Sequence, residues 1–202
     1  MSDVITDAIS NRDYVVVIDK SGSMTSRDCP GNRTRWEYCQ ESVQALTEKV
    51  CSYDPDGVDL YFFSSSFSKT ENVNGSKVAE LFKAQTPMGS TMFAPVLADI
   101  FKSHFAKSAR PTTVLFITDG EANDPAETCK EIIKASNKIE VDAELAISFI
   151  QIGKDISAQI FLKKMDDDLQ GAGAKFDIVD TITMTDMENR SLEETLFNAI
   201  MD

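Results

Sequence analysis

Five oxygen-bearing side chains in three separated stretches of the chain could bind one hard divalent cation. Asp19, Ser21 and Ser23 stand together in a D-x-S-x-S stretch, and Thr91 and Asp119 follow much later. Two carboxylates and three hydroxyls are hard donors, which suit Mg²⁺, Mn²⁺ or Ca²⁺ and do not suit zinc or copper. The residue types therefore predict a divalent-cation site, provided that the fold gathers the three stretches.

The elements that must position these side chains are two strands and a loop. Asp19 ends one apolar run, residues 14–18. Asp119 follows another, residues 113–118, and Thr91 lies in a loop between the two. Continuous apolar runs are typical of strands that are covered on both faces of a parallel sheet. Ligand sites of such sheets lie beyond the carboxyl ends of the strands, where the winding reverses. The two aspartates would meet at that edge if their strands are neighbours.

Strand-like and helix-like segments alternate along nearly the whole chain. The expected strands are residues 14–18, 58–63, 67–73, 113–118, 145–152 and 176–179. The expected helices are residues 35–50, 76–84, 92–106, one that opens at Asp124-Pro125, 157–169 and 192–200. This alternation predicts an α/β doubly wound domain with a mostly parallel central sheet, one antiparallel edge strand and helices on both faces. We expect a polar tail over residues 1–12 and a single domain over 13–202, closed by the last helix.

Composition and charge exclude several functions. The 202 residues carry a net charge of −13, which argues against a nucleic-acid surface and against binding to anionic membranes. No apolar run approaches the roughly 20 residues of a membrane span, and the start of the chain does not read as a secretory signal. The four cysteines form no C-x-x-C pair, so a zinc cluster is not expected. Together these features predict a cytoplasmic protein with free thiols.

The three oxygen-bearing stretches resemble the metal-ion-dependent adhesion site of the von Willebrand factor type A (VWA) family. Asp19, Ser21 and Ser23 match that family's D-x-S-x-S element, Thr91 matches its later threonine, and Asp119 matches its strand-end aspartate. The resemblance covers about residues 13 to 180, with the elements in the family's order. It implies that the three hydroxyls bind the cation and that the two carboxylates act directly or through water.

The resemblance also implies a function. In this family the cation, Mg²⁺ or Mn²⁺ more than Ca²⁺, accepts an Asp or Glu side chain of a partner protein. We therefore expect a non-enzymatic, cation-dependent adaptor or assembly module that is a monomer and that binds neither nucleic acid nor membrane.

One catalytic alternative also uses a strand-end aspartate with Mg²⁺. In phosphatases of the haloacid dehalogenase type such an Asp is the nucleophile, and an Asp two residues later is the general acid. Asp19 could be the nucleophile, but Ser21 occupies the second position. A simpler alternative is that each stretch is only a turn, since Asp and Ser often cap turns.

Residues beside these stretches raise two further questions. The loop that follows Ser23 contains Arg27, Arg33 and Arg35. These arginines could steer an acidic partner toward the cation, or they could pair with acids on the surface. Met24 and Phe93 flank the candidate ligands, and we expect them to pack in the core beneath the site.

Overall fold

A six-stranded sheet forms the centre of the computed structural model, which describes residues 11–52, 56–107, 110–183, 186 and 194–195. The strands are β1 (Asp13–Asp19), β2 (Val58–Phe63), β3 (Phe67–Val73), β4 (Thr112–Thr118), β5 (Leu145–Gln151) and β6 (Val179–Ile182). Their order in the sheet is β3-β2-β1-β4-β5-β6, and β3 alone runs antiparallel to its neighbour. The predicted doubly wound, mostly parallel sheet with one antiparallel edge strand is therefore confirmed.

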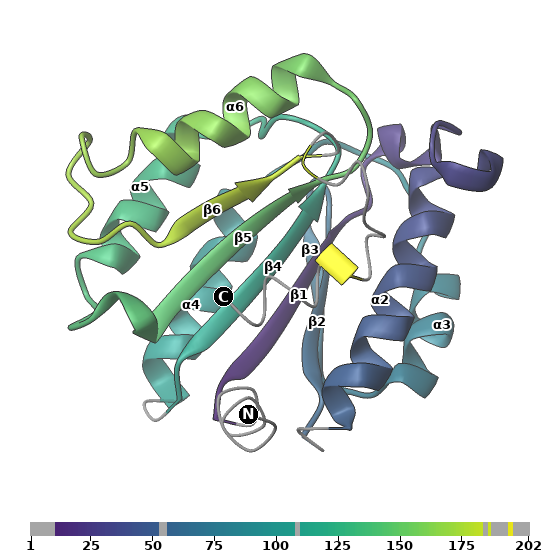
Figure 1. The fold of residues 1–202 in the computed structure, drawn as a ribbon, viewed down its shortest axis with the longest axis horizontal. Helices are drawn as coiled ribbons and strands as arrows, with labels where there is room; N and C mark the ends of the chain where they lie inside the picture. Colours follow the sequence, from purple (N-terminus) through teal and green to yellow (C-terminus); the bar gives the residue numbers. More distant parts are fainter. Residues whose placement is uncertain (1–10, 53–55, 108–109, 184–185, 187–193, 196–202) are drawn as a thin grey trace.

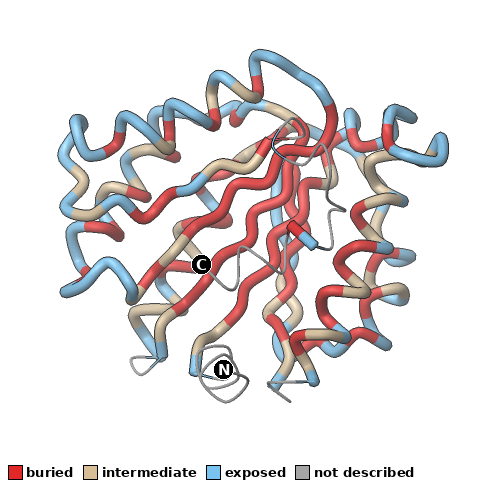
Figure 2. The backbone as a smooth tube through the Cα atoms, viewed as in Figure 1, coloured by how far each residue is buried: buried red, intermediate tan, exposed pale blue. Residues whose placement is uncertain are grey.

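Helices cover both faces of the sheet (Figure 1). The α-helices are α2 (Arg35–Cys51), α3 (Gly75–Lys83), α4 (Ala94–Lys107), α5 (Pro125–Ser136) and α6 (Ile156–Asp167). Three short 3-10 helices are η1 (Gly22–Thr25), η2 (Pro30–Asn32) and η3 (Asp142–Glu144). One hydrophobic core lies between the sheet and α2 with α3, and a second lies between the sheet and α4, α5 and α6. The central strands of the sheet are thus buried on both sides, whereas the edge strand β3 is largely exposed (Figure 2).

The continuous apolar run of β1 supplies both cores at once. Val16 and Ile18 belong to the core under α2, whereas Val15 and Val17 belong to the core under α4. Successive side chains of a strand point to opposite faces, so a strand covered on both sides must be apolar throughout. This explains why the apolar run of β1 shows no alternation and why the polar residue that follows the run, Asp19, marks the end of the strand.

The last strand differs from its prediction. The expected strand was residues 176–179, but β6 comprises Val179–Ile182. The backbone of Phe176 is bound elsewhere, because its amide donates to the hydroxyl of Ser136 at 2.8 Å and its carbonyl accepts from the same hydroxyl at 2.9 Å. A side chain on α5 therefore satisfies the backbone groups that a sheet partner would have used.

Other predictions fall partly or wholly outside the described residues. The closing helix expected over 192–200 lies there except for Glu194 and Thr195, which are helical. The expected tail lies there except for Asn11 and Arg12. The four cysteines are free, as expected. Within the described ranges, none of the helices combines the length and apolar character that crossing a membrane requires.

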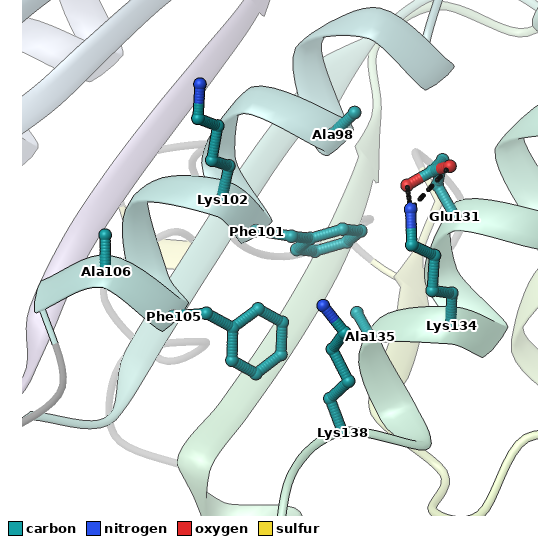
Figure 3. A pocket seen from close by; sticks show the side chains of 9 residues that line it. All are labelled: Ala98, Phe101, Lys102, Phe105, Ala106, Glu131, Lys134, Ala135 and Lys138. Atoms are coloured by element: carbon teal, nitrogen blue, oxygen red, sulfur yellow. Dashed lines mark hydrogen bonds and ion pairs between the residues drawn. The ribbon is translucent and has the colours of Figure 1, made fainter.

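A groove of about 490 Å³ lies between α4 and α5, and none of the candidate ligands lines it. Its floor includes Phe101 and Phe105, and lysines surround its rim (Figure 3). The carboxylate in its lining, Glu131, is paired with Lys134 at 3.3 Å. The groove therefore lacks the cluster of oxygen donors that the sequence indicates, and the candidate site lies elsewhere.

Candidate metal centre

The two aspartates predicted to meet do lie at the same edge of the sheet. Strands β1 and β4 are parallel neighbours, with Ile18 opposite Ile117. Asp19 is the last residue of β1, and Asp119 directly follows β4. Their exposed fractions are 0% and 2%. The topology therefore buries two carboxylates side by side at the carboxyl end of the sheet, which we call the crest.

A chain of hydrogen bonds links the first stretch to Asp119. The amide of Ser21 donates to Asp19 Oδ1 at 2.7 Å, and the hydroxyls of Ser21 and Ser23 lie 3.0 Å apart. The hydroxyl of Ser23 donates to Asp119 Oδ1 at 2.8 Å. Thr118 Oγ1 donates to Asp19 Oδ2 at 2.7 Å. Four of the five predicted residues are therefore connected in one polar cluster.

The fifth predicted residue, Thr91, lies in a loop that is attached to both of the other stretches. The amide of Met88 donates to the carbonyl of Lys20 at 2.7 Å. The amide of Thr91 donates to Asn123 Oδ1 at 2.7 Å, and the amide of Asn123 donates to the carbonyl of Thr91 at 2.8 Å. Gly89 permits this loop, since its φ is +92° and a Cβ there would lie 2.9 Å from Ser65 Oγ.

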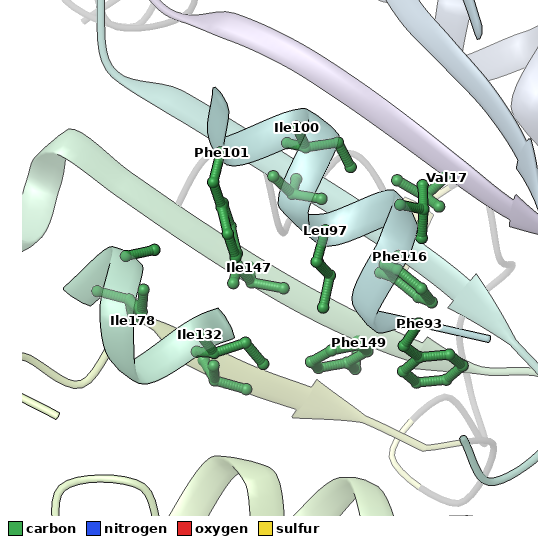
Figure 4. Close-up of a cluster of buried hydrophobic side chains, with 14 of the residues drawn as sticks. Val17, Phe93, Leu97, Ile100, Phe101, Phe116, Ile132, Ile147, Phe149 and Ile178 are labelled. Carbon is green, nitrogen blue, oxygen red and sulfur yellow. The ribbon is translucent and has the colours of Figure 1, made fainter. Parts of the chain in front are cut away.

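Aromatic packing anchors the same loop from below. Phe93, two residues after Thr91, is fully buried, and its ring centroid lies 4.6 Å from that of Phe116 and 5.8 Å from that of Phe149 (Figure 4). Met24, directly after Ser23, is also fully buried. The prediction that both residues pack beneath the site is confirmed. Large buried side chains next to the candidate ligands fix the backbone that carries the hydroxyls.

Asp124 has a different partner from the one its position suggests. It occupies the N-cap position of α5, at the point where this helix was predicted to open, but its side chain makes no hydrogen bond to that helix's free amides. Its carboxylate instead accepts from the amides of Phe93 and Ala94, both at 2.9 Å, where α4 begins. The loop after Asp119 therefore also holds the start of α4.

Burial and charge make the crest unfavourable for two free carboxylates. Loss of hydration on burial, and then the negative charge of Asp119, raise the pKa of Asp19 from its ordinary value of 3.8 to about 6. Hydrogen bonds from Ser21 and Thr118 oppose this shift without cancelling it. Such a pair favours a nearby positive charge.

Arg35 supplies one such charge through a contact with the buried Asp119, which neither sequence-based interpretation of the loop arginines included. Its Nη1 donates to Asp119 Oδ2 at 2.7 Å, and its Nη2 donates to Asp28 Oδ2 at 2.6 Å. Its side chain is 12% exposed, so its position is not that of a freely accessible steering residue. Arg27 and Arg33 pair with the surface acids Glu37 and Glu41. Arg27 and Arg33 therefore pair with surface acids, which was the second of the two roles considered for the loop arginines.

The donor set fits a hard divalent cation. The candidate ligands include only two carboxylates, and among the described residues no group of three or more His, Cys, Asp and Glu side chains could hold a metal ion. Hydroxyl oxygens would therefore have to complete the coordination shell. Such a set suits Mg²⁺ or Mn²⁺. The first and third stretches are also accessible: Ser23 is exposed, and a Cβ added at Gly22 or Gly120 would meet no atom within 4 Å.

The same geometry does not favour the phosphatase alternative. Both oxygens of Asp19 already accept hydrogen bonds, from the amide of Ser21 and the hydroxyl of Thr118. Asp19 is also fully buried, whereas a nucleophile must reach its substrate. Ser21 stands where the general acid would be required.

Comparisons with known proteins agree with the fold. The family model described as a vWA found in the TerF C terminus matches residues 12–202. Copine-E of Dictyostelium discoideum is 33% identical over 202 residues, an alignment that covers 81% of this chain and 33% of Copine-E. The chain thus spans about a third of the length of that relative.

Two solved structures have similar folds at low sequence identity. The von Willebrand factor type A protein from Catenulispora acidiphila has a TM-score of 0.67 and 16% identity, covering 95% of this chain and 42% of that one. The PilB minor pilin from Streptococcus sanguinis has a TM-score of 0.66 and 13% identity, covering 94% and 61%. At this identity the likeness shows the fold alone.

Proposed function

Because the chain belongs to the TerF-like group of von Willebrand factor type A domains, a family of protein-interaction modules, we propose that it binds partner proteins through a divalent cation. Asp19, Ser21, Ser23, Thr91 and Asp119 would hold Mg²⁺ or Mn²⁺ at the crest. The bound cation would supply a Lewis-acidic position for an Asp or Glu side chain of the partner. We propose that the module acts as a monomeric cytoplasmic adaptor without catalytic activity.

One observation carries this proposal. Two buried carboxylates lie at the crest, and the exposed Ser23 links them to the surface. Asp19 accepts from the amide of Ser21, whose hydroxyl lies 3.0 Å from that of Ser23, and the Ser23 hydroxyl donates to Asp119. Buried like charges are unfavourable unless a cation or a proton accompanies them. Arg35 balances the charge of Asp119, and a divalent cation at the seryl hydroxyls would balance the charge that remains.

The hydroxyls and the carboxylates of the proposed site would have different roles in binding the cation. Neutral hydroxyls of Ser21 and Ser23 can bind a cation without neutralising it, so the cation would keep its attraction for an outside carboxylate. Asp19 and Asp119 orient these serines through hydrogen bonds. The open space beside Gly22 and Gly120 leaves room for the partner's acidic side chain.

Cation binding is tested first on the isolated chain. We expect MgCl₂ to raise the midpoint of thermal unfolding relative to EDTA, because a ligand that binds only the folded state stabilises it by mass action. Asp119→Ala should abolish this shift. Asp59→Ala, at the opposite end of the sheet, is the matched control and should retain it. An equal shift in wild type and Asp119→Ala would contradict the proposal.

Partner binding is tested by affinity capture from the native lysate in MgCl₂ and in EDTA. The expected partner is recovered in MgCl₂ only, is lost with Asp119→Ala, and loses binding when one of its own Asp or Glu residues is replaced by Ala. Capture that is the same in EDTA would show that the interaction uses another surface.

A further inference from the structure

Arg35 lies at a rigid position beside the candidate metal centre. It is the first residue of α2, directly after the N-cap Thr34. The amide of Glu37 donates to the hydroxyl of Thr34 at 3.0 Å, and the amide of Thr34 donates to the carboxylate of Glu37 at 2.8 Å. The amide of Arg35 donates to the carbonyl of Ser26 at 3.0 Å. This capping box fixes the backbone from which the guanidinium extends.

The guanidinium is held on three sides. Asp28 accepts from Nε and Nη2, with the shortest bond at 2.6 Å, and Asp119 Oδ2 accepts from Nη1 at 2.7 Å. Gly153 closes the third side, because a Cβ there would lie 2.5 Å from Cζ and 2.7 Å from Nε. The planar group thus fits between two carboxylates against a bare stretch of backbone. Nothing in the proposed function requires an arginine at this place.

The position of the guanidinium limits how many oxygens of Asp119 can coordinate a cation. Asp119 Oδ2 is bound to Arg35, and only Oδ1, which bonds Ser23, faces the hydroxyl cluster. Asp19 is restrained similarly, since its two oxygens accept from Ser21 and Thr118. Neither carboxylate can turn both of its oxygens toward one cation without giving up a hydrogen bond.

We propose, resting on the proposed cation site, that Arg35 makes this site selective for Mg²⁺ over Ca²⁺ by restricting Asp119 to one-oxygen contact. Ca²⁺ binds six to eight oxygens and often takes carboxylates through both oxygens, whereas Mg²⁺ requires a compact octahedral shell. Arg35 is therefore a positioning and specificity-determining residue, while the hydroxyls and carboxylates remain the ligands. Lys cannot replace it, because an ammonium lacks the planar fork that bonds two carboxylates at once.

The ratio of the two dissociation constants separates this role from simple electrostatics. Removing one positive charge strengthens the binding of any divalent cation, so Mg²⁺ and Ca²⁺ should gain equally from the charge alone. A change in the ratio instead reports a change in the geometry that the ligands can adopt. The measurement is isothermal titration calorimetry of each variant with MgCl₂ and, separately, with CaCl₂.

We expect the ratio Kd(Ca²⁺)/Kd(Mg²⁺) to fall by about tenfold in Arg35→Gln and in Arg35→Lys, since affinity in such sites follows ligand geometry and rigidity. Gly153→Ala should change the ratio in the same direction, because its Cβ would displace the guanidinium. Arg33→Gln is the matched control. Arg33 lies two residues before Arg35 but pairs with Glu41, so the wild-type ratio should remain.

A wild-type ratio in folded Arg35→Gln and Arg35→Lys would overturn the inference, as would an equal change in Arg33→Gln. If Arg35→Gln does not unfold cooperatively, Arg35→Lys, which keeps the charge, decides. The proposed function can fail separately. A wild-type chain that binds neither ion would refute both ideas, whereas Mg²⁺ binding with an unchanged ratio in the variants would refute only the role of Arg35.

Discussion

The aspartates at the two ends of the central sheet differ in burial and in ion pairing. At the amino end, Asp59 in β2 lies 3.3 Å from Lys107 and 3.8 Å from Lys69, and Lys107 is about half exposed. At the carboxyl end, Asp19 and Asp119 are both buried, and Asp119 forms a salt bridge with Arg35 at 2.7 Å. Negative charge is thus balanced at one end and in excess at the other.

This difference indicates which end is shaped by function. Partly exposed ion pairs such as those of Asp59 contribute little to stability and are easily replaced. A buried carboxylate without its own cation lowers stability, so it persists where it is useful for another reason. The following predictions test this contrast between Asp19 and Asp59, from the largest expected effect to the smallest.

Asp19→Asn should stabilise the cation-free protein. In EDTA at pH 7 we expect the free energy of unfolding to rise by roughly 1–3 kcal/mol, because each unit of the raised pKa corresponds to about 1.4 kcal/mol. The amide keeps an oxygen that can accept from Ser21. Urea unfolding followed by circular dichroism measures the change. If the Asp19→Asn variant were less stable than wild type, the negative charge of Asp19 would not be destabilising the folded protein.

The destabilising charge of Asp19 should also make the free energy of unfolding depend on pH. The pKa of Asp19 is raised from 3.8 to about 6 in the folded state, so the folded protein binds the extra proton between these values. In EDTA, the contribution of the Asp19 side chain to the free energy of unfolding should therefore decrease as pH rises through this interval. The stability difference between wild type and Asp19→Asn should be small near pH 4 and largest above pH 6 to 7. A difference independent of pH would contradict the shift.

Asp59→Asn should have the smallest effect. We expect a loss of about 0.5–1 kcal/mol in the free energy of unfolding, as is typical of partly exposed ion pairs, and a decrease of that loss in high salt. The thermal shift produced by MgCl₂ should be the same as in wild type. An altered response to Mg²⁺ would mean that the two ends of the sheet are not independent.

The sequence could predict the features that depend on local pattern. The apolar run before Asp19 and the one before Asp119 indicated parallel strands. The rule that sites lie at carboxyl ends then predicted that both acids would meet if these strands were neighbours, which the structure shows. The burial of Phe93 followed from its position beside a candidate ligand in an apolar context. Each of these inferences needed only neighbouring residues and the general properties of α/β sheets.

The features that could not be predicted depend on contacts between distant residues. Arg35 and Asp119 are 84 residues apart, and an arginine at the start of a helix reads as a surface residue. Asp124 looked like the cap of its own helix, yet its carboxylate binds the amides at the start of α4. Phe176 was predicted to belong to a strand, yet its backbone binds the hydroxyl of Ser136. No local periodicity reports such pairings.

The hydrogen bonds between the crest loops have a consequence for binding affinity. The loop of Thr91 is joined to Lys20 on one side and to Asn123 on the other, and Phe93 fixes it to the interior. The conformational entropy of these segments is therefore lost when the chain folds, before any ligand arrives. Association then needs little further ordering of the protein, and most of the interaction energy remains available to hold the bound molecule.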